Sequence, residues 1–281
     1  MASSKKKKPK LTRMPAKRAD RELLRDINHL IKEEAVAWQS RGRLRGKVAV
    51  ITGASRGIGL ALAEALGKEG CNLVLASRNV LPLKVVASNS IYKTRVRYVV
   101  KSCDVRNPAS VDALFAAIKK RFSRIDFLIN NAGIAHRFAK VRDLSIEEWR
   151  DVIDTNLNGM FYCTRAALPL MSRGGVIVNN LSIAATTVFP DFSAYDASKH
   201  GALGFTNTLR EELRDEGIRV LALIVGSTDT DIWDQFMPEA DRKKMMPPAA
   251  VATAVVNAIS LPIDAPVEEI RMMPLSGTAR R

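Results

Sequence analysis

The sequence predicts a single α/β domain in which a parallel β-sheet is covered by helices on both faces. Three observations support this prediction. From Lys47 onward, short β-branched segments alternate with amphipathic helical segments, as expected when each strand is followed by a crossover helix. Several strand candidates are apolar at successive positions, which is typical of strands buried on both faces. The chain has 281 residues, of which 47% are hydrophobic, so it can form one large core.

Seven short segments are predicted as the strands of this sheet. They are 48–52 (VAVIT), 72–76 (NLVLA), 96–100 (VRYVV), 127–130 (FLIN), 176–179 (VIVN), 219–225 (RVLALIV) and 268–273 (EEIRMM). The segment after the first strand, 60–70, and the segment 195–217 are the clearest helix candidates between them. Strands that alternate with helices in this way predict parallel pairing.

The N-terminal residues differ in composition from the rest and carry most of the net charge of +15. Residues 1–18 have few apolar side chains and are predicted to be a basic, disordered tail, either a polyanion-binding or targeting segment or a solubilising extension. Residues 19–45 are predicted to be an amphipathic helical arm that packs on the domain or on a neighbouring subunit. The domain is predicted to cover residues 46–275, followed by a C-terminal tail, 276–281. The apolar stripe of the arm consists of Leu23, Leu24, Ile27, Leu30, Ile31 and Trp38.

The cysteines and the hydropathy indicate the compartment. Cys71, Cys103 and Cys163 are scattered and have no metal-ligand spacing, so we expect reduced core residues and no metal site. No apolar run approaches the roughly 20 residues that a membrane-spanning helix needs, and the N-terminus lacks the apolar core of a signal peptide. We therefore expect a soluble, cytoplasmic protein with no membrane partner.

The stretch TGASRGIG, 52–59, follows the first strand directly and leads into a helix. Gly53, Gly57 and Gly59 would let the backbone turn tightly and approach a pyrophosphate at the positive end of that helix. The arrangement predicts a dinucleotide site. The residues of the turn assigned to the cofactor are Gly53, Ser55, Arg56, Gly57, Ile58 and Gly59.

The end of the second strand indicates which dinucleotide binds. NAD-selective sites usually carry an acidic residue there, whereas this chain has Ser77 and Arg78. Arg56 in the glycine turn could reach the same place. A hydroxyl and two guanidiniums suit a 2′-phosphate, because guanidiniums bind phosphate oxygens bidentately. The sequence thus predicts NADP(H) over NAD(H); the alternative is that Arg78 only ends a strand in solvent.

The stretch YDASK, 195–199, opens the predicted helix 195–217. Tyr195 and Lys199 are four residues apart, so their side chains lie on one helix face, one turn apart. The ammonium would lower the pKa of the phenol, which is near 10 when unperturbed and therefore poorly matched to neutral pH. The spacing predicts an acid–base pair, and an ordinary pair on a solvated helix face is the alternative.

With TGASRGIG, NNAG (130–133) and YDASK in this order, the chain resembles the short-chain dehydrogenase/reductase family over residues 46–275. The resemblance implies a Rossmann-type, doubly wound domain. Its seven-stranded parallel sheet would have the order 3-2-1-4-5-6-7, with helices on both faces. It also implies a homodimer or homotetramer in which helices near 147–171 and 195–216 pair across subunits.

The resemblance assigns further site residues by position. The implied catalytic residues are Asn156, Ser182, Tyr195 and Lys199. In addition to the residues above, the implied cofactor residues are Asp104, Val105, Asn131, Ala132, Gly133, Tyr195, Lys199, Gly226, Thr228 and Thr230. After the sixth strand Val225 replaces a proline that the family often has, so the loop is expected to be looser and the nicotinamide contacts of Ser227 and Thr228 stay open.

The resemblance also implies a separate role for each of these side chains. Tyr195 would give a proton to the carbonyl oxygen, and Ser182 would donate a hydrogen bond to it as negative charge grows there. Lys199 would hold the nicotinamide ribose. Asn156 would order a water that links Lys199 to solvent.

Three variable stretches contribute a mostly aromatic set of side chains for the substrate, which suits a hydrophobic ketone or hydroxy compound. We therefore expect an NADP(H)-dependent carbonyl reductase or alcohol dehydrogenase. A 3-oxoacyl-[acyl-carrier-protein] reductase is an alternative, because a basic surface would steer an acidic carrier protein. A non-catalytic NADP-sensing or nucleic-acid-binding protein that uses the Lys-rich tail is another, although no catalytic position is lost. The predicted pocket residues are His136, Phe189, Phe192, Trp233 and Phe236, with Phe138 and Met237 nearby.

Overall fold

The computed structural model describes residues 42–277. The predicted basic tail, most of the predicted helical arm and residues 278–281 of the predicted C-terminal tail lie outside the described residues. Residues 42–45, the last of the range assigned to the arm, form a turn that packs on the domain. There Arg43 pairs with Glu69, and Leu44 is buried in the core.

Seven strands form one sheet in the order β3-β2-β1-β4-β5-β6-β7, and all neighbouring pairs are parallel. This confirms the predicted Rossmann-type fold and its strand order. The order reverses between β1 and β4, so a crevice is expected at the carboxyl ends of these two strands. The strands are β1 (Val48–Thr52), β2 (Asn72–Ser77), β3 (Tyr98–Ser102), β4 (Phe127–Asn130), β5 (Val176–Asn180), β6 (Arg219–Val225) and β7 (Glu269–Met272).

The third strand begins two residues later than the sequence predicts. Residues Tyr92–Thr94 form a 3₁₀ turn, and the next residue, Arg95, has a left-handed φ of 58°. Because a strand needs an extended backbone, pairing with β2 begins only at Tyr98. The β-branched pattern alone does not reveal that the chain is still leaving a turn at this point.

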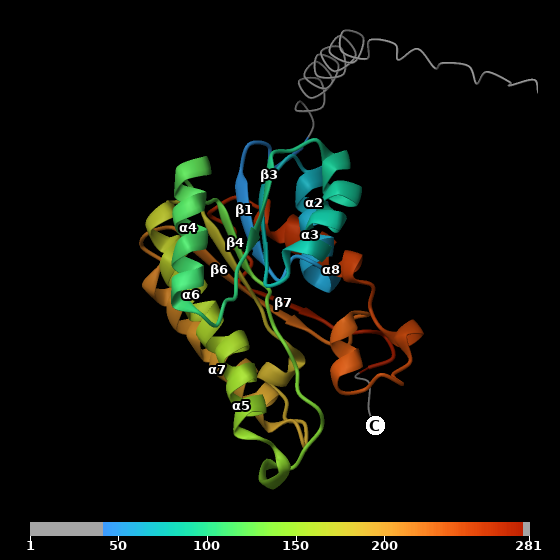
Figure 1. The fold of residues 1–281 in the computed structure, drawn as a ribbon. Coiled ribbons are helices and arrows are strands. Elements are labelled where there is room, and N and C mark those ends of the chain that lie inside the picture. Colours follow the sequence, from blue (N-terminus) through green and yellow to red (C-terminus); the bar gives the residue numbers. More distant parts are fainter. Residues whose placement is uncertain (1–41, 278–281) are drawn as a thin grey trace, which may run out of the picture. The chain divides into compact units, whose positions relative to one another are not determined.

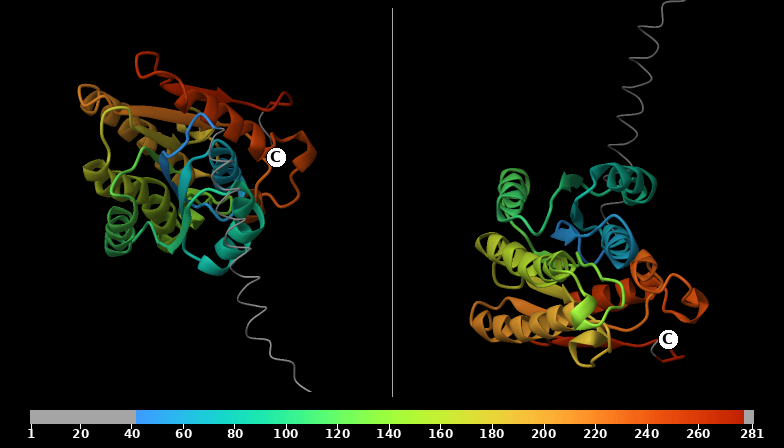
Figure 2. Two further views of the ribbon diagram at one scale, coloured as in Figure 1. Left: turned by 90° about the horizontal axis from the view of Figure 1, so that it is seen from above. Right: turned by 60° about the horizontal axis from the view of Figure 1, so that its bottom comes forward.

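Helices cover both faces of the sheet (Figure 1). Buried leucines of α2 and α3 and valines of α8 contribute to one core cluster, and apolar side chains of α4, α6 and α7 contribute to another. In Figure 2, α2 and α8 lie side by side on one face, with α4, α6 and α7 on the other. On the first face are α2 (Gly57–Lys68), α3 (Val80–Val86) and α8 (Pro248–Ile259); on the second are α4 (Pro108–Phe122), α6 (Gly159–Ala167) and α7 (Ser193–Glu212), with α5 (Ile146–Ile153) before α6.

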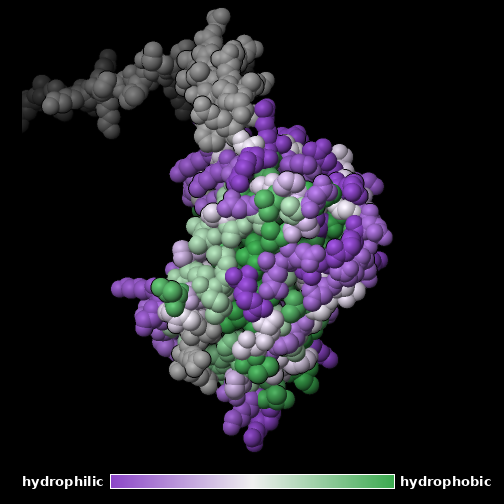
Figure 3. Space-filling view, turned by 180° about the vertical axis from the view of Figure 1, so that it is seen from behind, coloured by the Kyte–Doolittle hydropathy of each residue, from purple (hydrophilic) through white to green (hydrophobic). Residues whose placement is uncertain are grey.

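Hydrophilic and hydrophobic residues are unevenly distributed over the surface. Seen from behind, hydrophilic residues occupy most of the margins, whereas hydrophobic and weakly hydrophobic residues gather along the middle (Figure 3). No helix within residues 42–277 has both the length and the apolar character required to cross a membrane. The three cysteines are free and buried, as the sequence predicts.

Candidate active site

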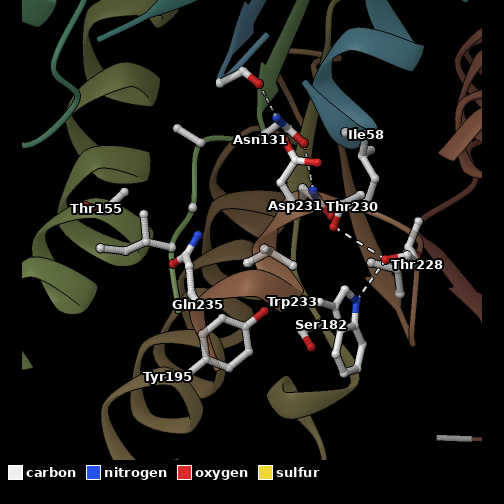
Figure 4. A pocket seen from close by; sticks show the side chains of 18 of the residues that line it. Ile58, Asn131, Thr155, Ser182, Tyr195, Thr228, Thr230, Asp231, Trp233 and Gln235 are labelled. Atoms are coloured by element: carbon white, nitrogen blue, oxygen red, sulfur yellow. Dashed lines mark hydrogen bonds between the residues drawn. The ribbon is translucent and has the colours of Figure 1, made fainter. Parts of the chain in front are cut away.

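One large cavity, with a volume of about 280 Å³, opens where strands β1, β4, β5 and β6 end. Every predicted site residue except Gly59, Asn156 and His136 lines it. In Figure 4, Ile58 and Asn131 lie toward one end of the cavity, and Tyr195 and Ser182 lie toward the other. The topology therefore brings the glycine turn and the YDASK helix to the same cavity, although they are far apart in the sequence.

The glycine turn has the geometry that a dinucleotide needs. Gly53 and Gly57 have φ angles of 64° and 56°, in the left-handed region that favours glycine. A Cβ atom on Gly59 would lie 2.4 Å from the Gly53 carbonyl oxygen, so helix and turn can approach closely only with glycine there. Helix α2 begins at Gly57, and its N-cap residue, Arg56, makes no side-chain cap hydrogen bond. The unpaired N–H groups of this positive helix end fit a pyrophosphate.

Asn131 links the ends of three strands beneath this turn. Its Nδ2 donates to the carbonyl oxygens of Thr52 and Gly53, at 3.0 and 3.1 Å. The Thr52 hydroxyl accepts hydrogen bonds from the backbone of Asn131 and Ala132, both at 3.0 Å. From β5, Asn180 donates to Asn131 Oδ1 at 2.9 Å. Through this network Asn131 has a structural role that does not depend on a bound ligand.

The basic residues at the end of β2 are available for an anion. The Arg78 side chain is exposed, lines the cavity, and makes no hydrogen bond or ion pair with any of residues 42–277. Arg56 is partly occupied, because its Nη1 lies 3.4 Å from Asp231 Oδ2. Ser77 and Ser55 join through their hydroxyls at 3.3 Å. These residues fit the 2′-phosphate of NADP, with Arg78 as the free cation.

Asp104, which the resemblance places at the adenine ring, is held by a residue that sequence reasoning missed. Arg106 binds its carboxylate in two places, with Nε 3.1 Å from Oδ1 and Nη2 2.8 Å from Oδ2. These hydrogen bonds lower the pKa of Asp104, and the nearby charge of Arg78 adds to the effect. Arg106 also reaches Asp151 at 2.6 Å. An arginine two residues after an aspartate is too common a pattern to predict this contact.

The side chains predicted to be catalytic lie together, but their contacts differ in detail from the expectation. Lys199 Nζ donates to the backbone oxygen of Asn180 at 3.0 Å and lies 5.6 Å from the centre of the Tyr195 ring. Ser182 Oγ accepts a hydrogen bond from Ala184 N at 3.1 Å, and its hydroxyl lies near enough to the Tyr195 hydroxyl to affect the pKa of the phenol. Phenol, hydroxyl and ammonium therefore gather at one end of the cavity.

The pKa of Tyr195 is raised, which is opposite to the expected direction. Burial raises it to about 12, the charge of Asp196 adds to this, and the interaction with the Ser182 hydroxyl opposes it. Burial also lowers the pKa of Lys199 to about 8. The expected lowering of the phenol pKa by Lys199 is therefore wrong for the protein alone: burial outweighs it, although Tyr195 is only half-buried, and Nζ is directed at the Asn180 carbonyl.

The lowered pKa of Lys199 makes a prediction about stability. The unfolded chain keeps this proton up to pH values near 10.5, whereas the folded chain releases it near pH 8. Between these values the unfolded state binds more protons, so the free energy of unfolding rises with pH. Relative to Lys199→Met, the wild type should gain roughly 2 kcal/mol between about pH 7.5 and 9.5, measured by urea unfolding. A constant difference over that range would mean that Lys199 is not desolvated. The raised pKa of Tyr195 lowers the free energy of unfolding as the pH rises, but only above about pH 10, because 10.0 is the pKa of this phenol in the unfolded chain.

Asn156 lies behind the cavity instead of lining it. Between α5 and α6, in the region near 147–171 predicted to be helical, lies a π-helical turn, Asp154–Asn158, of a kind often found at functional sites. The Asn156 amide exchanges two hydrogen bonds with the backbone of Ile134, both at 2.9 Å, and donates to Ser198 Oγ at 3.0 Å. Its side chain thus holds the chain after β4 against α7, and its role in ordering a water stays a prediction.

The end of the cavity near Tyr195, where the substrate is predicted to bind, is aromatic. Phe192 lies 4.8 Å from Tyr195 and 5.0 Å from Phe236, ring centre to ring centre. Trp233 continues the wall at 4.9 Å from Phe236, and its Nε1 donates to the Thr228 carbonyl at 2.9 Å (Figure 4).

His136 is not part of this lining. Its ring packs behind Phe192 at 5.0 Å, and its Nδ1 lies 2.6 Å from the Arg137 carbonyl oxygen. Sequence reasoning missed Gln235, which lines the cavity and accepts a hydrogen bond from Ala135 N at 3.1 Å. A lone glutamine in a variable loop carries no pattern that would identify it.

The loop after β6 is tied down, contrary to the expectation from Val225. The backbone of Ser227 accepts from Met246 N at 3.0 Å, and Asp229 N donates to the Met246 carbonyl at 2.9 Å. Thr228 Oγ1 donates to Gly226 O at 3.0 Å. Hydrogen bonds to Met246 therefore fix the backbone of this loop, which a proline at position 225 would otherwise restrict.

Among the described residues no group of three His, Cys, Asp or Glu side chains could hold a metal ion.

Comparisons with known proteins agree with this geometry. A family model described as short chain dehydrogenase matches residues 47–241. An uncharacterized oxidoreductase of Staphylococcus haemolyticus is 34% identical over 234 residues, which cover 83% of this chain and 99% of that protein. A 3β-hydroxysteroid dehydrogenase of Mediterraneibacter gnavus is 37% identical over 207 residues, 73% of this chain and 74% of that protein.

Solved structures give the same result. An alcohol dehydrogenase of the archaeon Thermococcus sibiricus, complexed with 5-hydroxy-NADP, matches with a TM-score of 0.77 and 31% identity over 84% of this chain and 99% of that one. A short chain dehydrogenase of Burkholderia cenocepacia in complex with NADP matches with a TM-score of 0.76 and 27% identity over 82% and 98%. The fold, the cavity and these matches establish that the chain belongs to the short-chain dehydrogenase family of oxidoreductases.

Proposed function

We propose that the chain is an NADP(H)-dependent carbonyl reductase or alcohol dehydrogenase with Tyr195 as the general acid and base. The observation that carries the proposal is that Tyr195, Ser182 and Lys199 line the same cavity as the glycine turn. A noncatalytic NADP sensor would not need to retain all of these groups. The four positions implied to be catalytic are filled by Asn156, Ser182, Tyr195 and Lys199.

The side chains suggest how the reaction runs. When bound, NADPH supplies a hydride for the carbonyl carbon. Ser182 donates its hydroxyl proton in a hydrogen bond to the carbonyl oxygen, where negative charge grows, and Tyr195 transfers a proton to that oxygen. With a pKa of about 8, Lys199 is mostly protonated at neutral pH, so it brings a positive charge to the end of the cavity where the phenolate forms. In the protein alone this charge does not overcome the effect of burial on the pKa of Tyr195. The aromatic wall excludes water from these steps.

NADP is proposed as the cofactor because Arg78 is free at the end of β2 and no acidic residue stands there. Two of the structures similar to this chain contain NADP or a derivative of it, which supports the same choice. A residue that selects by charge should reverse its preference when its charge is reversed.

Arg78→Asp is therefore expected to raise the KM for NADPH at least about tenfold and to lower the KM for NADH, because one charged hydrogen-bond donor to the 2′-phosphate is lost. Steady-state rates with both cofactors measure the change. Lys84→Asp reverses the charge of an exposed α3 residue that does not line the cavity, and it should leave both values unchanged. If Arg78→Asp keeps the wild-type preference, the 2′-phosphate lies elsewhere.

The aromatic lining favours a hydrophobic ketone or hydroxy compound as substrate. The similarity to a 3β-hydroxysteroid dehydrogenase points in the same direction. A screen of NADPH oxidation across steroids, quinones, aromatic aldehydes, 3-oxo acids and ketoacyl thioesters tests the proposal, with Tyr195→Phe beside the wild type. Turnover of none of these classes would refute it, and turnover of ketoacyl thioesters alone would replace it with 3-oxoacyl-[acyl-carrier-protein] reduction.

The proposal includes a cytoplasmic homodimer or homotetramer. Free cysteines fit a reducing compartment. Large apolar side chains stay exposed on and beside α5 and α6, which fits a subunit contact there: Val141, Ile146, Trp149 and Phe161. A monomer by sedimentation at micromolar concentration would contradict the oligomer.

A further inference from the structure

Asp196 is a buried carboxyl group beside the catalytic tyrosine that the proposed reaction does not use. It follows Tyr195 in α7, and only 8% of the residue is exposed. Its Oδ2 accepts a hydrogen bond from Phe189 N at 2.6 Å. Its own backbone N donates to the Phe192 carbonyl at 3.0 Å. Burying a carboxylate costs free energy unless hydrogen bonds compensate for it, so these contacts indicate that the carboxyl of Asp196 has a structural role.

The contacts hold both ends of one turn, Phe189–Phe192. Phe192 N closes the turn onto Phe189 O at 3.1 Å. Within it, Asp191 has a φ of 65°, a left-handed conformation that costs free energy for a residue other than glycine. A second loop contributes one contact, from Ala139 N to the Asp191 carbonyl at 2.8 Å. The turn is strained, so its shape depends on such external contacts.

Both ends of the turn carry an aromatic side chain of the cavity wall. Phe189 and Phe192 both line the cavity. The Phe192 ring lies 4.8 Å from the Tyr195 ring and 4.9 Å from that of Phe138. A shift of the turn would therefore move the wall against which an apolar carbonyl compound rests.

Within residues 42–277, the Phe189 N–H is the hydrogen-bond donor to this carboxyl. Burial raises the pKa of Asp196, whereas the Phe189 N–H and the nearby His200 stabilise its charged form. The second oxygen, Oδ1, is buried and has no hydrogen-bond partner within residues 42–277. Loss of the carboxyl would therefore act mainly through Phe189.

We propose that Asp196 is a positioning residue of the substrate site, which holds the turn Phe189–Phe192 so that the Phe192 ring stands against Tyr195 and the Phe189 ring lines the cavity. The role rests on the proposed carbonyl reduction, since it concerns the substrate of that reaction. It acts on the binding of the apolar carbonyl compound and not on that of NADPH, whose predicted contacts lie at the glycine turn and Arg78.

Asp196→Ala and Asp196→Asn test this role, because asparagine keeps an oxygen acceptor of the same shape. In Asp196→Ala the Phe189 amide should exchange its hydrogen about tenfold faster, and the KM for the carbonyl compound should rise about tenfold. Values of kcat and of the Kd for NADPH should change less than about threefold, as when only substrate binding is lost. Asp196→Asn should stay close to the wild type. Glu212→Ala, which removes an exposed carboxylate at the end of the same helix, should match the wild type throughout.

Two results would overturn the role. One is wild-type exchange at Phe189 in Asp196→Ala. The other is a loss of NADPH affinity as large as the rise in the carbonyl KM, which would mean that the whole site collapses. The exchange measurement needs no substrate. If the wild type reduces no carbonyl compound, the proposed function fails while the exchange rates still decide whether Asp196 holds the turn.

Discussion

Tyr195→Phe is expected to lower kcat for carbonyl reduction on the order of 10³-fold, the loss typical of a missing general acid. The change removes one oxygen atom and keeps the ring, which packs 4.8 Å from Phe192. NADPH should bind as before, because the glycine turn and Arg78 are untouched. The free energy of unfolding should change by about 1 kcal/mol or less, since the hydroxyl loses only its interaction with Ser182.

Steady-state rates, an NADPH fluorescence titration and urea unfolding measure these three quantities on one pair of proteins. Tyr162→Phe is a matched control, because it removes a phenol from α6 that does not line the cavity. A Tyr195→Phe protein that keeps the wild-type kcat would show that another group delivers the proton.

Gly59→Ala should abolish most cofactor binding by adding a single methyl group. Its Cβ would lie 2.4 Å from both Gly53 O and Asn131 Nδ2, so the turn or helix α2 must move. We expect the Kd for NADPH to rise roughly 10–100-fold and the free energy of unfolding to fall by roughly 1–3 kcal/mol. Fluorescence titration and urea unfolding measure the two effects.

Gly204→Ala is the matched control for this change. Gly204 lies in α7, and a Cβ built there meets no atom within 4 Å. Since alanine is the better helix former, this variant should be more stable by roughly 0.5–1 kcal/mol, with unchanged NADPH binding. Equal behaviour of the two variants would mean that close packing of Gly59 on the turn does not shape the cofactor site.

The fold was predictable because its signals are local and repeated. The predicted bounds of β1, β4 and β6 are those of the structure, since these strands are continuous apolar runs. Strand β3 starts later because the left-handed Arg95 still belongs to a turn, which no hydrophobic pattern encodes. The strand order came from the family resemblance and not from periodicity.

The site residues that belong to sequence motifs could be predicted, whereas those whose placement depends on tertiary contacts could not. The glycine turn, Ser182, Tyr195 and Lys199 meet in one cavity. His136 could not be placed from the sequence, because its direction depends on packing behind Phe192. The pKa of Tyr195 depends on burial, which a spacing of four residues does not report.

Hydride transfer itself is tested most directly with NADPH that carries deuterium at the reactive C4 position of its nicotinamide. After reaction of the wild type with a hydrophobic ketone from the screen, mass spectrometry of the alcohol reads out the transfer. Deuterium delivered from one face of C4 should appear on the carbinol carbon of the product, and Tyr195→Phe should form this product far more slowly. An alcohol without deuterium from either C4 epimer, or equal rates for the two proteins, would contradict carbonyl reduction at Tyr195.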